Sequence, residues 1–278
     1  MKQEKKIKVK DHFLTGEDFD IIPTAIEGIL QTSPTPSNLD RYYATTKYIS
    51  HHQDQGGLKE NIYKKFQHFN LNYKRNILAS HIKKNGQVLD YGCGAGEFLK
   101  FIEDDFKTFG YEPNTDARKA ADKKTHNTTL LADLSQIDNH SIDAITLWHV
   151  FEHIENQQDI IKTFYNKLKN NGLLIIAVPN YKSYDAQHYQ SFWAAYDVPR
   201  HVYHFSQKGM KNLFENNLWT IKEIKPLLLD SFYIAMMSEK YRQNPFFWLK
   251  GPVIGAISNL KASKTGEFSS LIYVIEKK

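Results

Sequence analysis

Residues 88–97 have the composition of a ligand-binding turn. Three glycines, Gly92, Gly94 and Gly96, alternate with other residues directly after a short apolar run. A strand that passes through such a turn into a helix exposes backbone N–H groups, and glycines leave room for a ligand to approach them. The dinucleotide-binding fingerprint requires a glycine at its sixth position, where this chain has Glu97. The turn therefore disfavours a nicotinamide cofactor.

A carboxylate completes this pattern. Glu112 lies 22 residues after Asp90, at the end of the second apolar run. A carboxylate at that place can accept hydrogen bonds from both ribose hydroxyls of a nucleoside. The alternative is a tight strand-to-helix turn that needs its glycines for packing alone.

Several histidines could accept a proton at neutral pH, because imidazole titrates near 6.5. These candidates are His149, His153, His201 and His204. We predict His201 as the general base, because the charge of the neighbouring Arg200 would depress the imidazole pKa and keep the ring neutral. His149 or His153 is predicted as a positioning group, and the alternative is that they bind a divalent metal together with Glu152.

The segment from His149 to His153 also matches the H-x-x-E-H spacing of inverted zinc proteases, with Glu152 as its acid. In those proteases the motif lies within a helix, whereas here it begins at the end of an apolar strand. We therefore do not expect a hydrolase. A hydrogen-bonded strand end is the plainer interpretation of this segment, and no metal ligand is predicted.

The elements that must position these residues alternate between apolar strands and helix-length polar segments. Strands are expected over 88–91, 108–112, 129–132, 144–148, 173–178, 219–224 and 271–275. One or two helices are expected over 58–82. A further helix is expected to end at Asn171-Gly172, directly before the fifth strand, and another to begin after Ser206 as its N-cap. Alternation of this kind requires crossover connections, so the sequence predicts an α/β fold with a parallel sheet covered on both faces.

Outside this core the sequence predicts three further segments. Residues 1–57 are polar and irregular and are interpreted as an N-terminal extension to a domain over 58–278. The aromatic-rich stretches 181–205 and 241–268 are expected to be long loops that cover a substrate. Phe192, Trp193, Tyr196, Phe246, Phe247 and Trp248 are the aromatic residues expected in this mobile cover. A loop that simply shields the sheet is the alternative.

Composition excludes several classes of protein. The chain has 278 residues, 41% of them apolar, and a formal charge of +5, which is typical of a globular protein. Its longest apolar run, 173–178, is far shorter than the roughly 20 residues of a transmembrane helix. A single cysteine excludes an intrachain disulfide framework, so a soluble, cytoplasmic protein is expected. The basic residues are spread along the chain, which does not favour a nucleic-acid partner. Interfacial contact of 246–250 with a membrane remains open, and the sequence does not indicate an oligomeric state.

Two more landmarks lie downstream of the glycine turn. Asp133 and Leu134 follow the third expected strand, and residues 142–145 open the fourth. With them, the segment from Gln87 to Asn180 resembles the class I S-adenosylmethionine-dependent methyltransferases, in the small-molecule branch that includes the ubiquinone-biosynthesis O-methyltransferases. The resemblance implies a Rossmann-like sheet of seven strands, mostly parallel with the last strand antiparallel, and helices on both faces.

The resemblance also implies a cofactor site for S-adenosylmethionine, with S-adenosylhomocysteine as the product. Asp90 would orient the methionyl amino group, Glu112 the ribose hydroxyls and Asp133 the exocyclic amine of adenine, while Trp148 and His149 would border the methionyl chain. The cofactor-binding residues implied are Asp90, Gly92, Cys93, Gly94, Glu112, Asp133, Leu134 and Trp148.

The segment around Glu152 resembles the E-x-x-E-H segment with which some ubiquinone O-methyltransferases hold a divalent metal, but His149 replaces the first glutamate. The stretch Asp197 to Ser206 resembles an insertion that a group of bacterial methyltransferases share. The Asn/Asp-Pro-Pro-aromatic motif of nucleic-acid amino-methyltransferases is missing after the fourth strand, so N-methylation of bases is not expected.

The sequence therefore predicts a methyltransferase that moves a methyl group to a small-molecule acceptor, with a hydroxyl oxygen as the expected nucleophile. One alternative is a non-catalytic module that keeps the fold and binds the cofactor, which the intact acidic and glycine landmarks disfavour. The other is a nicotinamide-dependent oxidoreductase, which Glu97 disfavours.

Overall fold

The computed structural model describes residues 6–43, 58–215 and 218–278. The last part of the predicted extension, 44–57, lies outside the described residues. The described chain divides into two compact units. Unit 1 contains residues 6–43, 151–155 and 177–273, and unit 2 contains residues 58–150, 156–176 and 274–278. The boundaries predicted from the sequence, an extension followed by one domain, stay a prediction.

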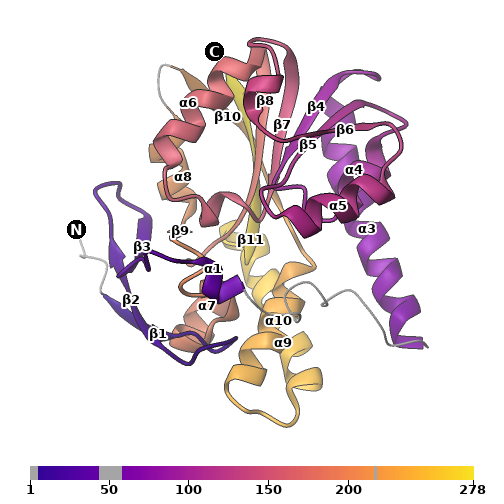
Figure 1. The fold of residues 1–278 in the computed structure, drawn as a ribbon. Coiled ribbons are helices and arrows are strands. Elements are labelled where there is room, and N and C mark those ends of the chain that lie inside the picture. Colours follow the sequence, from indigo (N-terminus) through magenta and orange to yellow (C-terminus); the bar gives the residue numbers. More distant parts are fainter. Residues whose placement is uncertain (1–5, 44–57, 216–217) are drawn as a thin grey trace. The chain divides into compact units, whose positions relative to one another are not determined.

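The larger of two sheets has seven strands in the order β10-β11-β8-β7-β4-β5-β6. Their bounds are β4 (Gln87–Tyr91), β5 (Lys107–Tyr111), β6 (Thr128–Leu131), β7 (Ile142–Trp148), β8 (Leu168–Pro179), β10 (Trp219–Pro226) and β11 (Ser270–Lys277). The strand β4 pairs in parallel with β5 and β7, and β5 pairs in parallel with β6 (Figure 1). The sheet is mostly parallel with one antiparallel end, which confirms the predicted Rossmann-like α/β fold.

Helices cover both faces of the β4–β5 region. Asp90 pairs with Gly110 and Tyr91 with Tyr111, so the two pairs point to opposite faces of the sheet. Tyr91 packs edge-on against Phe164 of α6, whereas Gly110 lies against Leu99 of α4. The helices of unit 2 are α3 (Leu58–His81), α4 (Glu97–Ile102), α5 (Thr115–Lys124) and α6 (Gln157–Lys167).

The start of β8 differs from the prediction. The helix α6 ends at Lys167, four residues before the predicted Asn171-Gly172 cap, and β8 begins at once with Leu168. The side chain of Leu168 is fully buried, and its carbonyl oxygen accepts a hydrogen bond from the Lys277 ammonium at 2.8 Å. Asn171 does adopt a left-handed conformation, but within the strand. Burial of Leu168 thus extends the strand through residues that look like a helix cap.

The N-terminal residues form a sheet, which corrects the prediction of an irregular segment. The strands β1 (Ile7–Lys10), β2 (Asp18–Pro23), β3 (Ile29–Ser33) and β9 (Tyr203–Phe205) pair in that order, all antiparallel. Their apolar residues alternate with polar ones, as Val9, Phe19 and Ile21 show, and each of these is buried in unit 1. The strands are short, which weakens the period-two signal that the sequence carries.

The two aromatic stretches are also more regular than predicted. The first contains the helix α7 (Tyr184–Tyr189) and the second contains α10 (Phe247–Thr265), which follows α9 (Asp230–Tyr241). The helix α8 (Gln207–Phe214) is capped by Ser206 as predicted. Trp193 and Tyr196 are core residues of unit 1 rather than parts of a mobile cover, and the indole N–H of Trp193 donates to Asp185. No described helix combines the length and the apolarity that crossing a bilayer requires.

Candidate active site

The glycine turn connects β4 to α4 in unit 2. The N–H groups of Gly92 and Cys93 both donate to the carbonyl oxygen of Tyr111, at 2.7 and 3.1 Å, which ties the turn to the end of β5. Gly92, Gly94 and Gly96 all have positive φ angles, a conformation that side chains with a Cβ disfavour. The turn is therefore held in one conformation by its neighbour strand.

Only one side of this turn is open. A Cβ on Gly92 would lie 2.6 Å from a methyl carbon of Val150, and one on Gly96 would lie 3.0 Å from Ala121. A Cβ on Gly94 would meet nothing within 4 Å. Gly92 and Gly96 thus satisfy packing, as the alternative interpretation of the sequence proposed, while Gly94 faces space that a ligand can enter.

Glu112 lies at the edge of this space. One carboxylate oxygen accepts the N–H of Gly94 at 2.9 Å, and the other accepts the N–H of Asn114 at 2.8 Å. The side chain is almost fully buried. A carboxylate has about four acceptor sites, so Glu112 can still accept hydroxyl groups after these two bonds.

Asp90, on β4, carries the most perturbed carboxyl group of this region. Burial raises its pKa to about 7, against the hydrogen bond that the Thr146 hydroxyl donates at 2.6 Å. The positive charge of Lys74 lowers the same pKa, and the negative charge of Glu112 raises it. A cationic group beside Asp90 would compensate a charge that the protein itself solvates poorly.

Lys74, on α3, was not predicted from the sequence. Its ammonium lies 4.6 Å from the ring centroid of Trp148, at the end of β7, and Phe98 contacts the same ring edge-on. The indole nitrogen of Trp148 is buried and has no hydrogen-bond partner among the described residues. An amphipathic helix with several lysines gives no signal that singles out this one.

Two residues shortly after β6 line a cavity of about 430 Å³. Asp133 and Leu134 border it together with Tyr91 and Tyr111, whose rings stack with centroids 4.8 Å apart. Hydrogen bonds from the hydroxyl of Ser135 and from its N–H, the latter at 2.7 Å, lower the pKa of Asp133. The structure thus places a flat aromatic wall beside the acid that was predicted to contact adenine.

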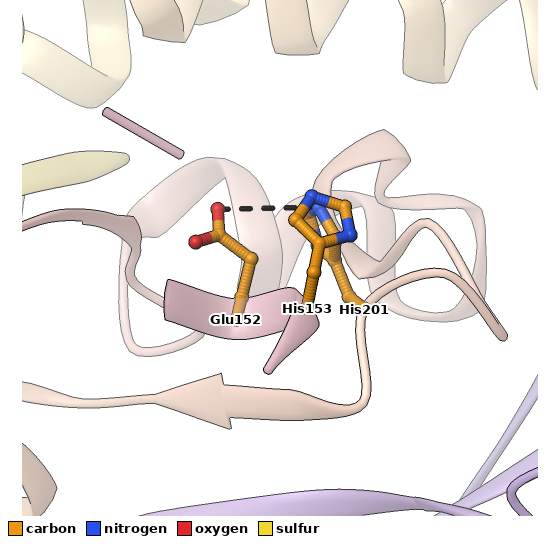
Figure 2. Close-up of side chains that lie close together, drawn as sticks. All are labelled: Glu152, His153 and His201. Carbon is orange, nitrogen blue, oxygen red and sulfur yellow. Dashed lines mark ion pairs between the residues drawn. The ribbon is translucent and has the colours of Figure 1, made fainter. Parts of the chain in front are cut away.

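A second group of side chains, in unit 1, consists of Glu152, His153 and His201 (Figure 2). Glu152 and His153 lie on the short helix η3 (Phe151–His153), and His201 comes from the segment before β9. One ligand atom of each residue lies within 4.8 Å of those of the other two. The imidazole rings of His153 and His201 pack edge to face, with centroids 4.6 Å apart, and His201 Nε2 lies 4.0 Å from Glu152 Oε1.

Backbone carbonyls fix the orientation of both rings. Nδ1 of His153 lies 2.9 Å from the carbonyl oxygen of Arg200, and Nδ1 of His201 lies 2.9 Å from that of Ala195. A carbonyl can only accept, so in the neutral rings Nδ1 carries the proton and Nε2 carries the lone pair. Burial and the neighbouring His201 lower the pKa of His153 to about 4. The group presents basic nitrogens beside a buried carboxylate.

The other predicted histidines lie elsewhere. His149 has a left-handed backbone at the end of β7 and is not part of this group. His204 is buried on β9, with Nε2 2.9 Å from the Thr32 hydroxyl. Burial lowers the pKa of His204 well below its usual value.

Arg200 is paired with two carboxylates. Its buried guanidinium donates to Asp11 at 2.9 Å and to Asp197 at 2.7 Å, and two carboxylates therefore compensate its charge. Its Nη1 donates to the carbonyl oxygen of Tyr42. Arg200 thus connects the N-terminal segment to the insertion. The orientation of the His201 ring is fixed by the carbonyl of Ala195.

The Glu152 group also fits the donor set of a divalent metal ion. Two imidazole nitrogens and one carboxylate oxygen are common ligands of zinc and iron, and orientation of each ring by a carbonyl on its other nitrogen is typical of such ligands. The residues that would hold an ion are Glu152, His153 and His201, not His149 as the H-x-x-E-H spacing indicates.

Comparison with known proteins identifies the fold's relatives. A family model described as a methyltransferase domain matches residues 63–223. A carboxy-S-adenosyl-L-methionine synthase of Campylobacter hominis is 29% identical over 111 residues, 36% of this chain and 47% of that protein. An (S)-coclaurine N-methyltransferase of Papaver somniferum is 26% identical over 162 residues, 51% of this chain and 46% of that protein. The chain spans about half the length of the curated relatives it matches.

Among solved structures, the mycolic acid cyclopropane synthase CmaA1, crystallised with S-adenosylhomocysteine, covers 74% of this chain and 84% of its own at a TM-score of 0.51 and 12% identity. That likeness shows the fold. The family model covers more than half of the chain and includes both the glycine turn and the Glu152 group. The chain belongs to the methyltransferase domain family, with the fold of the class I S-adenosylmethionine-dependent enzymes, as the resemblance in its sequence predicted.

Proposed function

We propose that this protein is an S-adenosylmethionine-dependent methyltransferase that acts on a hydroxyl group of a small molecule. The observation that carries the proposal is the open side of Gly94, bordered by a Glu112 carboxylate that retains free acceptor capacity. A nucleoside is the ligand that such an edge recognises best, because its vicinal hydroxyls can both donate to one carboxylate.

The charges around this turn match the methionyl end of the cofactor. The amino group is cationic and the carboxylate anionic, and the turn offers Asp90 for the first and Lys74 for the second. Asp133 and Leu134 take the adenine beside the aromatic wall, and Trp148 borders the methionyl chain. Gly92 and Cys93 hold the turn against Tyr111.

When bound, the cofactor supplies an activated methyl group, so the protein needs to align the acceptor and remove its proton. We assign proton removal to His201, because Ala195 fixes its ring with the Nε2 lone pair free to accept. His153 packs against this ring and positions it, and Glu152 stabilises the imidazolium that forms. His149 stays a positioning candidate at the end of β7.

The named relatives do not decide the acceptor. One acts on nitrogen and another is a carboxy-S-adenosyl-L-methionine synthase, so acceptor chemistry differs among proteins that share this domain. The hydroxyl assignment rests on the buried imidazole and carboxylate group of this chain, which a neutral amine nucleophile would not need to the same extent.

The test combines binding and turnover. Calorimetry should show binding of S-adenosylhomocysteine and no competition by NAD⁺ or NADH, which separates the proposal from an oxidoreductase. Incubation with a metabolite extract and methyl-labelled S-adenosylmethionine should then give a labelled small molecule, identified by mass spectrometry. Binding without any labelled product would favour the non-catalytic module, and absence of binding would remove the proposal.

A further inference from the structure

The outer face of α10 carries an apolar stripe that the fold leaves uncovered within its unit. Leu249, Val253, Ala256 and Leu260 recur at the spacing of one helix face, and all four are exposed. The three large side chains are each more than half exposed. Soluble helices normally turn such a stripe inward.

The helix α10 packs against its unit through the opposite face, so the stripe is not the face that forms the core. Gly251, Gly255, Ser258 and Ala262 are buried at the same spacing on the opposite side of the helix. A Cβ on Gly251 would lie 2.6 Å from Met236 of α9, and one on Gly255 would lie 2.9 Å from Phe232. The small residues thus allow close packing of α9 on α10, and the large apolar residues of α10 point the other way.

One exposed aromatic residue continues this surface. Phe246 lies directly before α10, three residues before Leu249 and seven before Val253, and it is 62% exposed. Phenylalanine is common on the lipid-facing side of helices that lie at a membrane interface.

The segment that contains α9 and α10 has a net positive charge. Residues 230–265 contain five basic residues and two acidic ones, and of the acidic pair Glu239 is buried. The Lys250 ammonium lies 3.2 Å from the Glu239 carboxylate, which compensates its charge. Lys261 and Lys264 are exposed and share one side of the stripe by their spacing along the helix. Lysines that flank an apolar stripe can extend their ammonium groups towards anionic headgroups while their stems lie along the apolar surface.

We propose that this surface, defined by Phe246, Leu249, Val253 and Leu260 with the flanking Lys261 and Lys264, binds an anionic lipid bilayer. The helix lies in the plane of the interface, with the stripe towards the acyl chains and the lysines at the headgroups. A second copy of the chain fits less well, because pairing two such faces would bring the same lysines together. The proposal is independent of the cofactor and of the acceptor.

Co-sedimentation of the full chain with vesicles tests this directly, without cofactor or substrate. The protein should sediment with vesicles of phosphatidylcholine and phosphatidylglycerol at low salt, less at high salt, and poorly with phosphatidylcholine alone. Val253→Glu places a charge in the stripe and should weaken binding at least tenfold. Leu218→Glu is the matched control, because Leu218 and Val253 are equally exposed, each at 51%, and it should bind as the parent does.

A third variant tests the contribution of the lysine charges to vesicle binding. Each lysine near an anionic surface contributes about 1 kcal/mol, so Lys264→Gln should weaken binding roughly fivefold and reduce the salt dependence. Circular dichroism of each variant establishes that it is folded. The proposal is overturned if the parent stays in the supernatant with anionic vesicles at low salt, or if Val253→Glu sediments like Leu218→Glu. A dimer in sedimentation equilibrium that Val253→Glu dissociates, without vesicle binding, would assign the stripe to a second copy instead.

Discussion

Glu112 accepts backbone N–H groups from two segments and is also the proposed partner of the ribose. Loss of hydrogen bonds to a charged group costs about 1.5–3 kcal/mol each, so Glu112→Ala should weaken binding of S-adenosylhomocysteine at least tenfold. Glu103 provides a matched control, because its carboxylate also accepts two backbone N–H groups, from His126 and Asn127, away from the glycine turn. Glu103→Ala should lower the melting temperature and leave the affinity measured by calorimetry unchanged. Equal affinity of Glu112→Ala and the parent would remove the ribose assignment.

His201 has a ring orientation that suits proton transfer, because the Ala195 carbonyl accepts from its Nδ1. If it accepts the acceptor's proton, His201→Ala should lower turnover by about 100-fold with nearly unchanged cofactor affinity. His126, an exposed histidine before β6, serves as the control, and His126→Ala should keep full turnover. The measurement is transfer of labelled methyl to the hydroxyl acceptor found by the extract screen.

The same assay distinguishes direct proton transfer from metal assistance. Treatment of the parent with a chelator should leave turnover unchanged if His201 acts as the base. Loss of turnover that zinc or magnesium restores would instead show that Glu152, His153 and His201 act as ligands, and the base assignment would fall.

These residues differ in how far the sequence could reveal them. The cofactor candidates follow strand ends: Glu112 is predicted from its spacing after Asp90, whereas the roles of Asp90 and Asp133 are implied by the family resemblance, and all three stay predictions. The Glu152 group could not be predicted, because His201 lies 48 residues after His153 along the chain and the two meet only through the packing of the insertion. Spacing instead favoured His149, which shares a motif with Glu152 but not its surroundings.

In the strand-to-helix turn, substitutions at Gly92 and Gly94 measure the effects of packing and of ligand binding separately. Gly94→Ala adds a methyl group to open space at a positive φ, so we expect a loss of about 1 kcal/mol in stability. It should nevertheless weaken cofactor binding tenfold or more, because the methyl group occupies the space that the ligand needs. Gly92→Ala places its Cβ against the stiff side chain of Val150 and should lower the melting temperature more. Unchanged affinity in Gly94→Ala would show that the ligand lies elsewhere.

The strands of the central sheet were predictable because they alternate with helix-length polar segments. The strands β4 to β7 lie within one or two residues of their predicted bounds. The N-terminal strands are four to six residues long and include charged positions such as Lys8 and Asp20, so their alternation was too brief to recognise. The helix α10 was hidden for a different reason, because apolar residues on both of its faces give no single helical stripe.

At the scale of the molecule, the chain passes between the two units several times. Residues 151–155, which include Glu152 and His153, belong to unit 1, although the residues on both sides of them along the chain belong to unit 2. No composition shift marks these crossings, so the sequence indicated an extension and one domain instead. The division follows from contacts between distant segments, such as the ion pair between Arg200 and Asp11, which only the folded chain shows.

The pH dependence of global stability follows from Asp90. Its pKa rises from 3.8 to about 7 on folding, because burial disfavours the ion. The folded protein therefore binds more protons than the unfolded chain between these values, and this contribution to stability is present below pH 4 and is lost as pH rises towards 7. At its steepest, the loss is about 1.4 kcal/mol per pH unit. Asp90→Asn keeps an oxygen that can accept from Thr146 but cannot ionise.

Melting curves of the parent and Asp90→Asn between pH 5 and pH 8 measure this contribution, since every other titrating group is common to both proteins. We expect the variant to gain stability relative to the parent as pH rises, and to bind S-adenosylhomocysteine more weakly at pH 8, because it lacks the charge that faces the methionyl amino group. Lys74→Met is the complementary change. It removes the cation that lowers the pKa of Asp90, so the loss of stability should continue to higher pH and reach a larger total than in the parent, with the same limiting slope. Parallel melting curves for the parent and Asp90→Asn would show that Asp90 titrates at its ordinary value in the folded protein.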